Sequence, residues 1–548
     1  MSADHTVGTA MLHLVASQGI PVVFGLPGVH NLAFWSSDSP VRVIGVRHEQ
    51  AAVYAADGYA RATGRLGVAF STTGPGAVNG IAAFGEACVS GSPLLLISSD
   101  VSTALRHPDG PRGILHEMAD QAAPFAAFGV RAITASTAEE ALAEVADALS
   151  RAQASPAQPT YLGVPSDILS SPWTAPLPVV PPPPAHTAPA PEGVEALAEL
   201  IRTCSRVIVW VGGGVTQAGT EGEQAVVALA ERLGAPVVTT YAGRGVMAGH
   251  PLAVEASVHE PEVGSLIASA DLLLVVGSGF DAMNTKNWKM PMPQRRAAIG
   301  LGSELPRTIA WDVLLQADLV EALGTLEASL GDVHRNPWND VPLREVIRTR
   351  VAADERTADA VEFVDAVELW PADGVIVTDM CIPGYWTSSH AVQPRSRRLI
   401  NPVGWGTLGF ALPAAMGPAS AGMRTLAVCG DGGPMFALGE LATYVQERLP
   451  VTLIIVDDGG YGMLRFDQKV FGHEHRGVDL VTPDWALLAQ SFGIPFTEVT
   501  DGATLRAALA ESARHDGPSM IVQRAEFFPP ASTSPRWFES VPGNTETA

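Results

Sequence analysis

The chain alternates short apolar runs with alanine-rich, helix-forming stretches, and this alternation restarts twice to give three series. Residues 41–44, 66–70 and 93–97 are apolar runs of strand length in the first series; the second series begins at 206–211 and the third at 375–378. Strands that alternate with helices form βα units, which build parallel sheets covered by helices. The sequence therefore predicts an α/β protein with several parallel sheets.

A proline-rich stretch separates the first series from the second. Nine prolines lie between Pro172 and Pro191, and four of them are consecutive at 181–184. Proline disrupts helices and inner strands and favours extended chain, so this stretch is predicted to be a linker. A chain of 548 residues is also too long for one core. We predict an N-terminal domain at 1–170, a linker at 171–192, a middle domain at 193–335, a linker at 336–358 and a C-terminal domain at 359–548.

The balance of charges argues against two classes of partner. The sequence has 57 acidic residues against 34 lysines and arginines, a formal net charge of −23. Such a surface repels nucleic-acid phosphates and anionic lipids, so we expect neither nucleic acid nor membrane as a partner. The apolar runs are too short to cross a bilayer and the N-terminus shows no secretory signal, so we expect a cytoplasmic protein.

The strongest chemical signal is a pair of turns that follow two strands of the third series. The strand 425–429 runs into Gly-Asp-Gly-Gly at 430–433, and the strand 451–456 runs into Asp-Asp-Gly-Gly at 457–460. Open α/β sheets bind ligands at the carboxyl ends of their strands. Glycines there let backbone N–H groups approach a diphosphate, and a hard cation can bridge carboxylate and phosphate oxygens.

These turns resemble the signature of the thiamin-diphosphate-dependent decarboxylase and acetolactate synthase superfamily, a Gly-Asp-Gly followed about two dozen residues later by Asn-Asn. The resemblance covers nearly the whole chain and implies pyrimidine-binding, middle and diphosphate-binding domains, in that order. It implies thiamin diphosphate and Mg²⁺ as cofactors, with the side chains of Asp431 and Asp458 and the backbone carbonyl of Gly460 as metal ligands. One position departs from the family, because Asp457-Asp458 replaces Asn-Asn and adds negative charge beside the diphosphate.

A second match to the same family lies in the N-terminal domain. Residues Arg47 to Gly64 resemble the family pattern Arg-His-Glu followed by Ala-x-Gly-Tyr-Ala-Arg-x-Thr-Gly. The resemblance assigns Glu49 as the catalytic acid that activates the cofactor. A carboxylic acid is needed because the aminopyrimidine must be protonated at its ring nitrogen before its exocyclic nitrogen can take the thiazolium C2 proton.

Further segments resemble family elements around the cofactor. The turns at 25–28 and 71–76 resemble those that line the substrate side, and 404–415 resembles the segment that holds the aminopyrimidine. In this family the two halves of each site meet across a dimer interface, so a homodimer or homotetramer with shared sites is expected. The cofactor-binding residues implied are Gly28, Glu49, Gly74, Gly406, Leu408, Gly430, Asp431, Gly432, Gly433, Asp458, Gly460, Tyr461, Gly462 and Met463.

Three histidines are candidates for proton transfer near the substrate: His30, His107 and His116. Imidazole titrates near neutral pH, and His116 is the preferred candidate, although each histidine also fits a structural or solvated role. The family implies a 2-oxo acid as substrate, with or without a second carbonyl compound as acceptor. The segment 461–465 resembles both acetolactate synthases and benzoylformate decarboxylases, so decarboxylation and carboligation both stay open.

Two alternatives to a non-oxidative decarboxylase or carboligase also stay open. Several relatives hold FAD in the middle domain, where this chain has a glycine-rich turn at 211–218. The turn lacks a Gly-x-Gly-x-x-Gly pattern and the turn at 277–283 has no arginine, so the sequence favours a domain without flavin over a flavin-linked 2-oxo-acid oxidase. A catalytically silent binding or assembly protein would have lost Glu49 or Asp431, and both are present.

Overall fold

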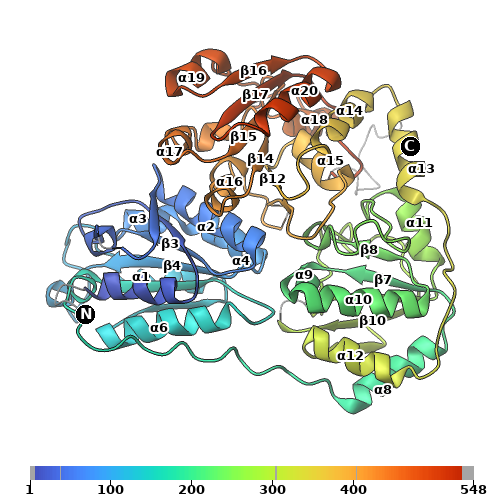
Figure 1. Cartoon of the computed structure of the whole chain (residues 1–548), viewed down its shortest axis with the longest axis horizontal. Helices are drawn as coiled ribbons and strands as arrows, with labels where there is room; N and C mark the ends of the chain where they lie inside the picture. Colours follow the sequence, from blue (N-terminus) through green and yellow to red (C-terminus); the bar gives the residue numbers. More distant parts are fainter. Residues whose placement is uncertain (1–5, 38, 303–304, 403, 534–548) are drawn as a thin grey trace.

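The computed structural model describes residues 6–37, 39–302, 305–402 and 404–533. Figure 1 shows three lobes, with the N-terminal domain in blue, the middle domain in green and the C-terminal domain in orange and red. Each lobe contains one sheet, of six, five and six strands in turn, and the strands within each sheet are parallel. The predicted α/β class with parallel sheets is confirmed. The residues at 1–5 and 534–548, which the predicted domains include, lie outside the described residues.

The N-terminal sheet has the strand order β2-β1-β3-β4-β6-β5. The strands predicted to begin at 41, 66 and 93 are β2, β3 and β4, and each begins one residue later. β3 and β4 are buried along their whole length, which explains their continuous apolar sequences. The elements are α1 Val7–Ser17, β1 Val22–Gly25, β2 Arg42–Gly45, α2 Glu49–Thr63, β3 Gly67–Ser71, α3 Pro75–Asn79, α4 Ile81–Val89, β4 Leu94–Asp100, α5 Ala123–Ala126, β5 Arg131–Thr134, α6 Ala138–Arg151, β6 Thr160–Pro165 and α7 Ser166–Leu169.

The proline-rich stretch leaves the N-terminal domain after α7 as extended chain. Figure 1 shows it running along the outside of the molecule to α8. It forms no helix and no strand beyond a single bridge from Pro172 to Thr6. The Ser150 hydroxyl donates to the Pro182 carbonyl at 2.8 Å and fastens it to the N-terminal domain.

The middle sheet has the order β11-β10-β9-β7-β8, so the chain order reverses between β7 and β9. Such a switch point is a common place for a ligand in an open α/β sheet. The elements are α8 Pro191–Arg202, β7 Val207–Val211, α9 Gly213–Gln217, α10 Gly219–Leu233, β8 Val237–Thr239, α11 Pro261–Ser269, β9 Leu272–Val276, β10 Arg295–Gly300, β11 Val313–Gln316 and α12 Leu319–Ser329.

The C-terminal sheet has the order β13-β12-β14-β15-β17-β16. β14 and β15 are neighbours, with Gly430 opposite Val456, so the two turns of the sequence signature start side by side. The predicted linker at 336–358 contains a helix, α13. The elements are α13 Leu343–Ala353, α14 Ala358–Val367, β12 Val375–Thr378, α15 Ile382–His390, β13 Leu399–Ile400, α16 Ala411–Ser420, β14 Thr425–Gly430, α17 Glu440–Glu447, β15 Val451–Asp457, α18 Gly462–Val470, α19 Trp485–Phe492, β16 Phe496–Val499, α20 Gly502–Ser512 and β17 Ser519–Arg524.

Helices α2 and α16 join the N-terminal and C-terminal domains of one chain. A Cβ atom on Gly58 would lie 2.1 Å from a backbone oxygen of α16, and one on Gly417 would lie 2.2 Å from a backbone nitrogen of α2. Beside this crossing, Arg61 forms buried ion pairs with Asp57 at 2.8 Å and Glu86 at 2.9 Å. The two domains that carry the predicted cofactor residues therefore pack directly on each other.

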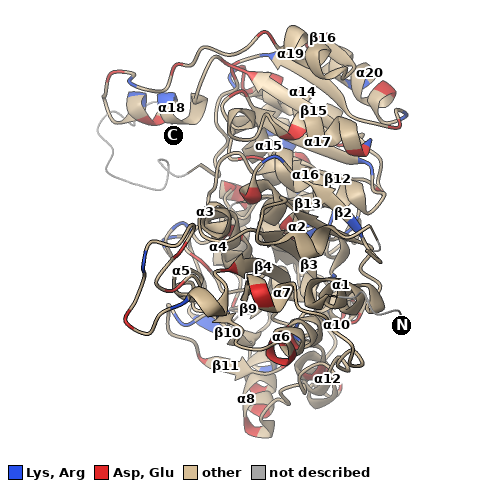
Figure 2. Ribbon diagram, turned by 90° about the vertical axis from the view of Figure 1, so that its left-hand side faces the viewer, with Lys and Arg blue, Asp and Glu red and all other residues tan. Residues whose placement is uncertain are grey.

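In the view of Figure 2, Lys and Arg residues are scattered among Asp and Glu residues rather than gathered on one face. The same view shows α18 projecting from the body of the C-terminal domain. Within the described ranges, no helix is both long and apolar enough to cross a bilayer.

Candidate active site

The Gly-Asp-Gly-Gly turn after β14 surrounds a buried carboxylate. Asp431 is only 1% exposed, and both of its carboxylate oxygens are buried without a hydrogen-bond partner. A Cβ on Gly432 would lie 2.5 Å from the Tyr461 ring, and one on Gly433 would lie 2.9 Å from the Asp379 carboxylate, whereas Gly430 has more room. An unpaired buried carboxylate is costly, so this turn is arranged for a cation that it would bind.

The two aspartates after β15 differ in their contacts. Asp457 Oδ2 accepts hydrogen bonds from Trp485 Nε1 at 2.9 Å and Arg524 Nη1 at 3.2 Å, and its Oδ1 accepts from a backbone N–H of the same turn. Asp458 Oδ1 accepts from Arg465 Nη2 at 2.7 Å. Both aspartates are therefore engaged by the fold, and the role of Asp458 as metal ligand stays a prediction.

The carboxylates of this site repel one another. Burial, together with the nearby charges of Asp458 and Asp457, raises the pKa of Asp431. Burial also raises the pKa of Asp458 to about 6, against the opposing effect of Arg465. Shifts of this sign are expected where acidic groups are gathered without a cation. A divalent metal ion would relieve the repulsion.

The residues after Asp458 are held close to neighbouring backbone. A Cβ on Gly460 would lie 2.0 Å from the Val478 carbonyl oxygen, and one on Gly462 would lie 2.1 Å from Asp458 Oδ2. Tyr461 N–H donates to the Val478 carbonyl at 2.8 Å, and Met463 packs against the core. The glycines are required by this packing, and the role of the Gly460 carbonyl as a metal ligand stays a prediction.

Asp379 is a site residue that the sequence analysis missed. It is 2% exposed, and its carboxylate accepts from the backbone N–H groups of Gly409 at 3.1 Å and Ala411 at 3.2 Å. It therefore ties the segment predicted to hold the aminopyrimidine to the Gly433 turn. Burial raises the pKa of Asp379 to about 6. Its position directly after β12, an acidic residue at a strand end like Asp431, was the available signal.

The segment 404–411 lies between the two domains. Gly406 has a φ of +78°, which favours glycine, and its N–H donates to the Pro402 carbonyl at 2.8 Å. The Thr407 hydroxyl lies 2.5 Å from the Tyr54 hydroxyl of α2. Leu408 is 36% exposed, which is unusual for a large apolar side chain. The predicted roles of Gly406 and Leu408 toward the cofactor stay predictions.

Glu49 is the first residue of α2 and is 7% exposed. The Asn79 amide donates to Glu49 Oε2 at 3.0 Å, and a Cβ on Gly76 would lie 3.2 Å from Oε1. The short helix α3 therefore covers the carboxyl group and orients it. This is the environment that the predicted role of Glu49 requires: a held, nearly buried carboxyl group.

Glu440, another residue that the sequence analysis missed, holds the chain just before Glu49. It is 1% exposed, and its Oε1 accepts from the backbone N–H groups of Arg47 at 2.8 Å and His48 at 3.1 Å. The contact spans the N-terminal and C-terminal domains. No local sequence pattern connects positions so far apart.

Two of the three predicted histidines lie together. The rings of His30 and His116 are edge to face with centroids 5.5 Å apart, and the Nδ1 atom of each is buried without a hydrogen-bond partner. Burial, and then the proximity of His116, lowers the pKa of His30. His107 is exposed, with Asp109 at 3.4 Å as its ion-pair partner.

The turns around this histidine pair include both predicted glycines of the substrate side. A Cβ on Gly74 would lie 2.5 Å from the His116 carbonyl oxygen, and one on Gly28 would lie 2.5 Å from the Thr72 side chain. The Gly74 N–H donates to the Gln121 side chain at 2.6 Å. The structure therefore brings Gly28, Gly74, His30 and His116 to one edge of the N-terminal sheet.

The glycine-rich turn of the middle domain is filled by the chain itself. Gly214 N–H donates to the Gly277 carbonyl at 2.9 Å, and a Cβ on Gly212 would lie 2.2 Å from the same oxygen. Ser278 Oγ accepts from Trp210 Nε1 at 3.3 Å and from a backbone N–H at 3.1 Å. The two turns at the switch point thus bind each other.

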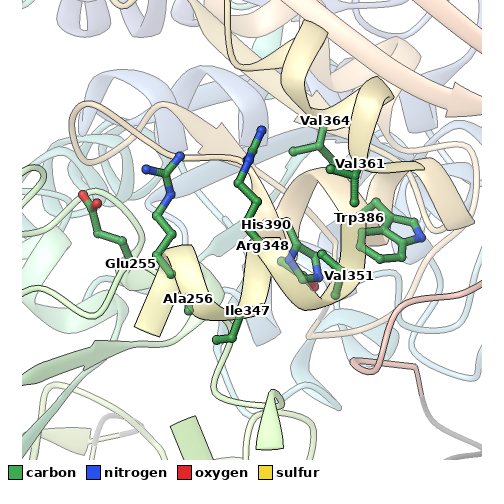
Figure 3. Close-up of a pocket in the computed structure, with 11 residues that line it drawn as sticks. Glu255, Ala256, Ile347, Arg348, Val351, Val361, Val364, Trp386 and His390 are labelled. Atoms are coloured by element: carbon green, nitrogen blue, oxygen red, sulfur yellow. The ribbon is translucent and has the colours of Figure 1, made fainter. Parts of the chain in front are cut away.

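A separate small pocket lies where α13, α14 and α15 meet the middle domain. Figure 3 shows Arg348, Val351, Trp386 and His390 around it. Burial lowers the pKa of His390 to about 3, so this imidazole is neutral. None of the predicted cofactor or catalytic residues lines this pocket, which is therefore distinct from the candidate site.

The positions of Asp431 and Asp458 fit a metal ion that takes its other ligands from a phosphate group and water. In the part of the chain that the structure describes, no group of three or more His, Cys, Asp or Glu side chains could hold a metal ion alone. Mg²⁺ is usually bound by one or two carboxylates and completed by waters and substrate phosphates. Asp431 and Asp458 at adjoining strand ends match that arrangement.

Comparisons with known proteins agree with this geometry. Models of the thiamine pyrophosphate enzymes match residues 5–124 (N-terminal TPP binding domain), 194–326 (central domain) and 381–523 (C-terminal TPP binding domain). The two TPP binding domains carry Glu49 and Asp431, respectively. Thiamin diphosphate is the cofactor that these domains imply.

Three relatives match over most of the chain. A probable 2-ketoarginine decarboxylase of Pseudomonas aeruginosa is 33% identical over 95% of this chain and 94% of its own length. The large subunit of acetolactate synthase isozyme 2 of Escherichia coli is 30% identical over 93% and 94%. A probable acetolactate synthase large subunit of Methanocaldococcus jannaschii is 26% identical over 95% and 92%. The chain therefore belongs to the thiamine pyrophosphate enzyme family, with its N-terminal, central and C-terminal domains.

Proposed function

We propose that this chain is a thiamin-diphosphate- and Mg²⁺-dependent enzyme that acts on a 2-oxo acid by non-oxidative decarboxylation, carboligation or both. The observation that carries the proposal is the pairing of an unpartnered buried carboxylate, Asp431, with Asp458 at adjoining strand ends. The presence of a held glutamate, Glu49, in the other TPP binding domain supports catalysis over a silent binding protein.

Each part of the site has a defined task in this proposal. When bound, thiamin diphosphate would supply a nucleophilic thiazolium carbon and a ring that accepts the electrons left behind by the departing CO₂. Asp431 and Asp458 would hold the metal ion, which would offset negative charge of the diphosphate. Glu49 shares a proton with the aminopyrimidine ring nitrogen, and the Asn79 amide fixes the carboxyl group so that the proton stays at that position.

The histidine pair is proposed to manage protons on the substrate side. His30 and His116 have buried, unpartnered Nδ1 atoms, so each can donate to or accept from a substrate oxygen or carbon. Burial keeps His30 neutral near pH 7, which suits a group that passes a proton on. His107, which is exposed, is the least supported of the three.

The names of the relatives define the substrates to test. One relative is named for 2-ketoarginine and two for acetolactate synthesis. The protein should therefore be incubated with thiamin diphosphate, Mg²⁺ and a panel that includes 2-ketoarginine, pyruvate and an aromatic 2-oxo acid, with and without an aldehyde. We expect CO₂ and either an aldehyde or a 2-hydroxy ketone, identified by mass. Turnover that needs an electron acceptor would favour the oxidase alternative, and no turnover with any acid would favour the silent one.

Glu49→Gln tests the mechanism. The amide cannot supply the proton, so turnover should fall by about 10²–10⁴-fold while thiamin diphosphate still binds. Near-normal turnover in this variant would remove the central mechanistic claim.

Two copies of the chain are proposed to complete each site. Large apolar side chains are exposed around the predicted cofactor segments of both domains: Val29, Leu32 and Leu115 on the N-terminal side, and Trp405, Leu408, Met435 and Phe436 on the C-terminal side. Large apolar side chains exposed on both sides of a site suit an interface that covers them. A symmetric dimer would cover both groups at once.

Mixing two inactive variants tests this arrangement. If Glu49 and Asp431 of one site come from different subunits, a heterodimer of Glu49→Gln and Asp431→Ala contains one intact site. Unfolding and refolding the mixture should then restore about one quarter of wild-type activity, because half of the random dimers are mixed and each has one good site. If both residues come from the same subunit, the mixture stays inactive.

A further inference from the structure

Three aspartates follow β14 and β15 at the proposed diphosphate site, and of these three Asp431 is the one without a cationic partner. Asp431, Asp457 and Asp458 follow two adjacent strands, so their negative charges are gathered at one end of the sheet. A diphosphate brings further negative charge, and one Mg²⁺ offsets only two charges. The protein must therefore supply positive charge of its own.

Asp457 has a cationic partner, Arg524, on the neighbouring strand β17. Arg524, the last residue of β17, lies 3.2 Å from Asp457 Oδ2 and is itself 62% exposed. Trp485 donates to the same oxygen. The charge of this carboxylate is thus offset by an arginine of the neighbouring strand.

Asp458 has its own arginine. Arg465 Nη2 donates at 2.7 Å to Asp458 Oδ1 and at 2.7 Å to the Asp458 backbone carbonyl. Both side chains are largely buried, 16% exposed for Arg465 and 14% for Asp458. A buried pair of this kind depends strongly on both members, because removal of one leaves the other uncompensated.

The same arginine connects the turn to helix α18. α18 projects from the domain in Figure 2 and has no fully buried residue. Arg465 Nε also lies 3.4 Å from Asp479 Oδ1, and Nη2 would lie 3.1 Å from a Cβ on Gly460. A guanidinium group can hold two acceptors at fixed angles, which an ammonium group does less well.

We propose that Arg465 is a positioning residue that offsets the charge of Asp458 and fixes its carboxylate, so that this chain can use an aspartate beside the diphosphate. The inference rests on the proposed function. It makes Asp458 and Arg465 one unit: the arginine is needed because position 458 carries a charge, and it should be dispensable when that charge is absent.

A double-mutant cycle tests the unit. Thiamin diphosphate affinity is measured by calorimetry at several Mg²⁺ concentrations for wild type, Asp458→Asn, Arg465→Met and the double variant, together with the melting temperature of each apo protein. Arg465→Met should weaken affinity by roughly tenfold or more, because an unpaired carboxylate faces the diphosphate. Asp458→Asn should bind as well as wild type or better, and the double variant should return to within about threefold of wild type.

Controls separate a positioning role from a structural one. Arg131→Met breaks an ion pair with Glu144, another buried carboxylate, in the N-terminal domain, and should leave affinity unchanged. Arg465→Lys keeps the charge and should recover part of the lost affinity. Unchanged affinity in Arg465→Met, or a loss that Asp458→Asn does not rescue, would overturn the proposal.

The remaining outcomes are also decisive. If Arg465→Met does not fold but the double variant folds and binds, the charge is the cause and the proposal stands. If neither folds, Arg465 serves the fold alone and the proposal fails. If the wild-type protein does not bind thiamin diphosphate, the proposed function fails. This outcome differs from failure of the Arg465 proposal alone, in which the wild type binds the cofactor and the Arg465 variants do not behave as expected.

Discussion

The middle and C-terminal domains each place a glycine-rich turn at the carboxyl end of a central parallel strand, yet the two turns differ in what fills them. In the middle domain, Gly212 and Gly214 press against the Gly277 carbonyl, and the polar groups of the turn bond to one another. In the C-terminal domain, Gly432 and Gly433 also lie close to neighbouring side chains, but both carboxylate oxygens of Asp431 are without a partner. Glycine allows close contact in both turns. Of the two, the C-terminal turn contains a buried carboxylate, Asp431, without a hydrogen-bond partner.

The difference teaches how a glycine turn should be interpreted. Close backbone packing at a switch point requires glycine whether or not a ligand binds there. A buried polar group without a partner is the additional sign of a ligand site.

The largest expected effect is the loss of cofactor binding on removal of the unpaired carboxylate. Asp431→Ala should weaken thiamin diphosphate affinity in the presence of Mg²⁺ by about 100-fold or more, since the metal loses a charged ligand. Asp281→Ala removes a carboxylate that follows the middle-domain turn and accepts from the Asn284 N–H at 2.9 Å, so it should leave affinity unchanged. Calorimetry on both variants decides whether the turns differ as described.

Gly212→Ala should affect the fold rather than the cofactor. Its Cβ would lie 2.2 Å from the Gly277 oxygen, so the backbone must move, at a cost of about 1–3 kcal/mol. We expect a melting temperature lower by several degrees and thiamin diphosphate affinity within about threefold of wild type. Selective loss of cofactor binding in a well-folded variant would mean that the middle-domain turn serves the cofactor after all.

The pH dependence of apo-protein stability gives a smaller effect. The folded-state pKa of Asp431 is raised above the unfolded value, so the stabilisation linked to its protonated form is present at low pH and is lost as the pH rises through the folded pKa. Asp431→Asn does not titrate and should raise the melting temperature by a few degrees at pH 8, with a smaller gain at pH 5. An equal gain at both pH values would mean that the carboxylate is not under charge repulsion.

The smallest expected effect is none at all. Because the polar groups at the middle-domain switch point already bond to one another, purified protein titrated with FAD should show no change in flavin fluorescence and no change in turnover. Stoichiometric flavin binding would break the comparison, since a filled turn would then have opened for a ligand.

The sequence predicted the parts of this molecule that depend on local patterns. Apolar runs located strands such as β3 and β4 because a buried parallel strand must be apolar along its length. Asp431 could be identified because a strand, a glycine turn and a carboxylate are adjacent in sequence. The predicted linker at 336–358 missed α13, although Ile347 and Val351 are buried at helical spacing within its charged sequence.

The parts that sequence could not supply are contacts between distant segments. Glu440 reaches the N–H groups before Glu49 from another domain, and Asp379 binds N–H groups about thirty residues further along the chain. The pairing of Asp458 with Arg465 depends on how α18 leaves its turn. Such partners are set by the packing of whole elements, which no spacing rule in one chain encodes.

The crossing of α2 and α16 has a consequence for how this chain can change over generations. At Gly58 and Gly417 the backbones of the two helices are in contact. The N-terminal and C-terminal domains can pack this closely because neither position carries a side chain. Neither position takes part in the chemistry, yet even alanine would push the N-terminal and C-terminal domains of the chain apart. In a survey of all single substitutions, changes at Gly58 and Gly417 should reduce activity as severely as changes at Glu49 and Asp431.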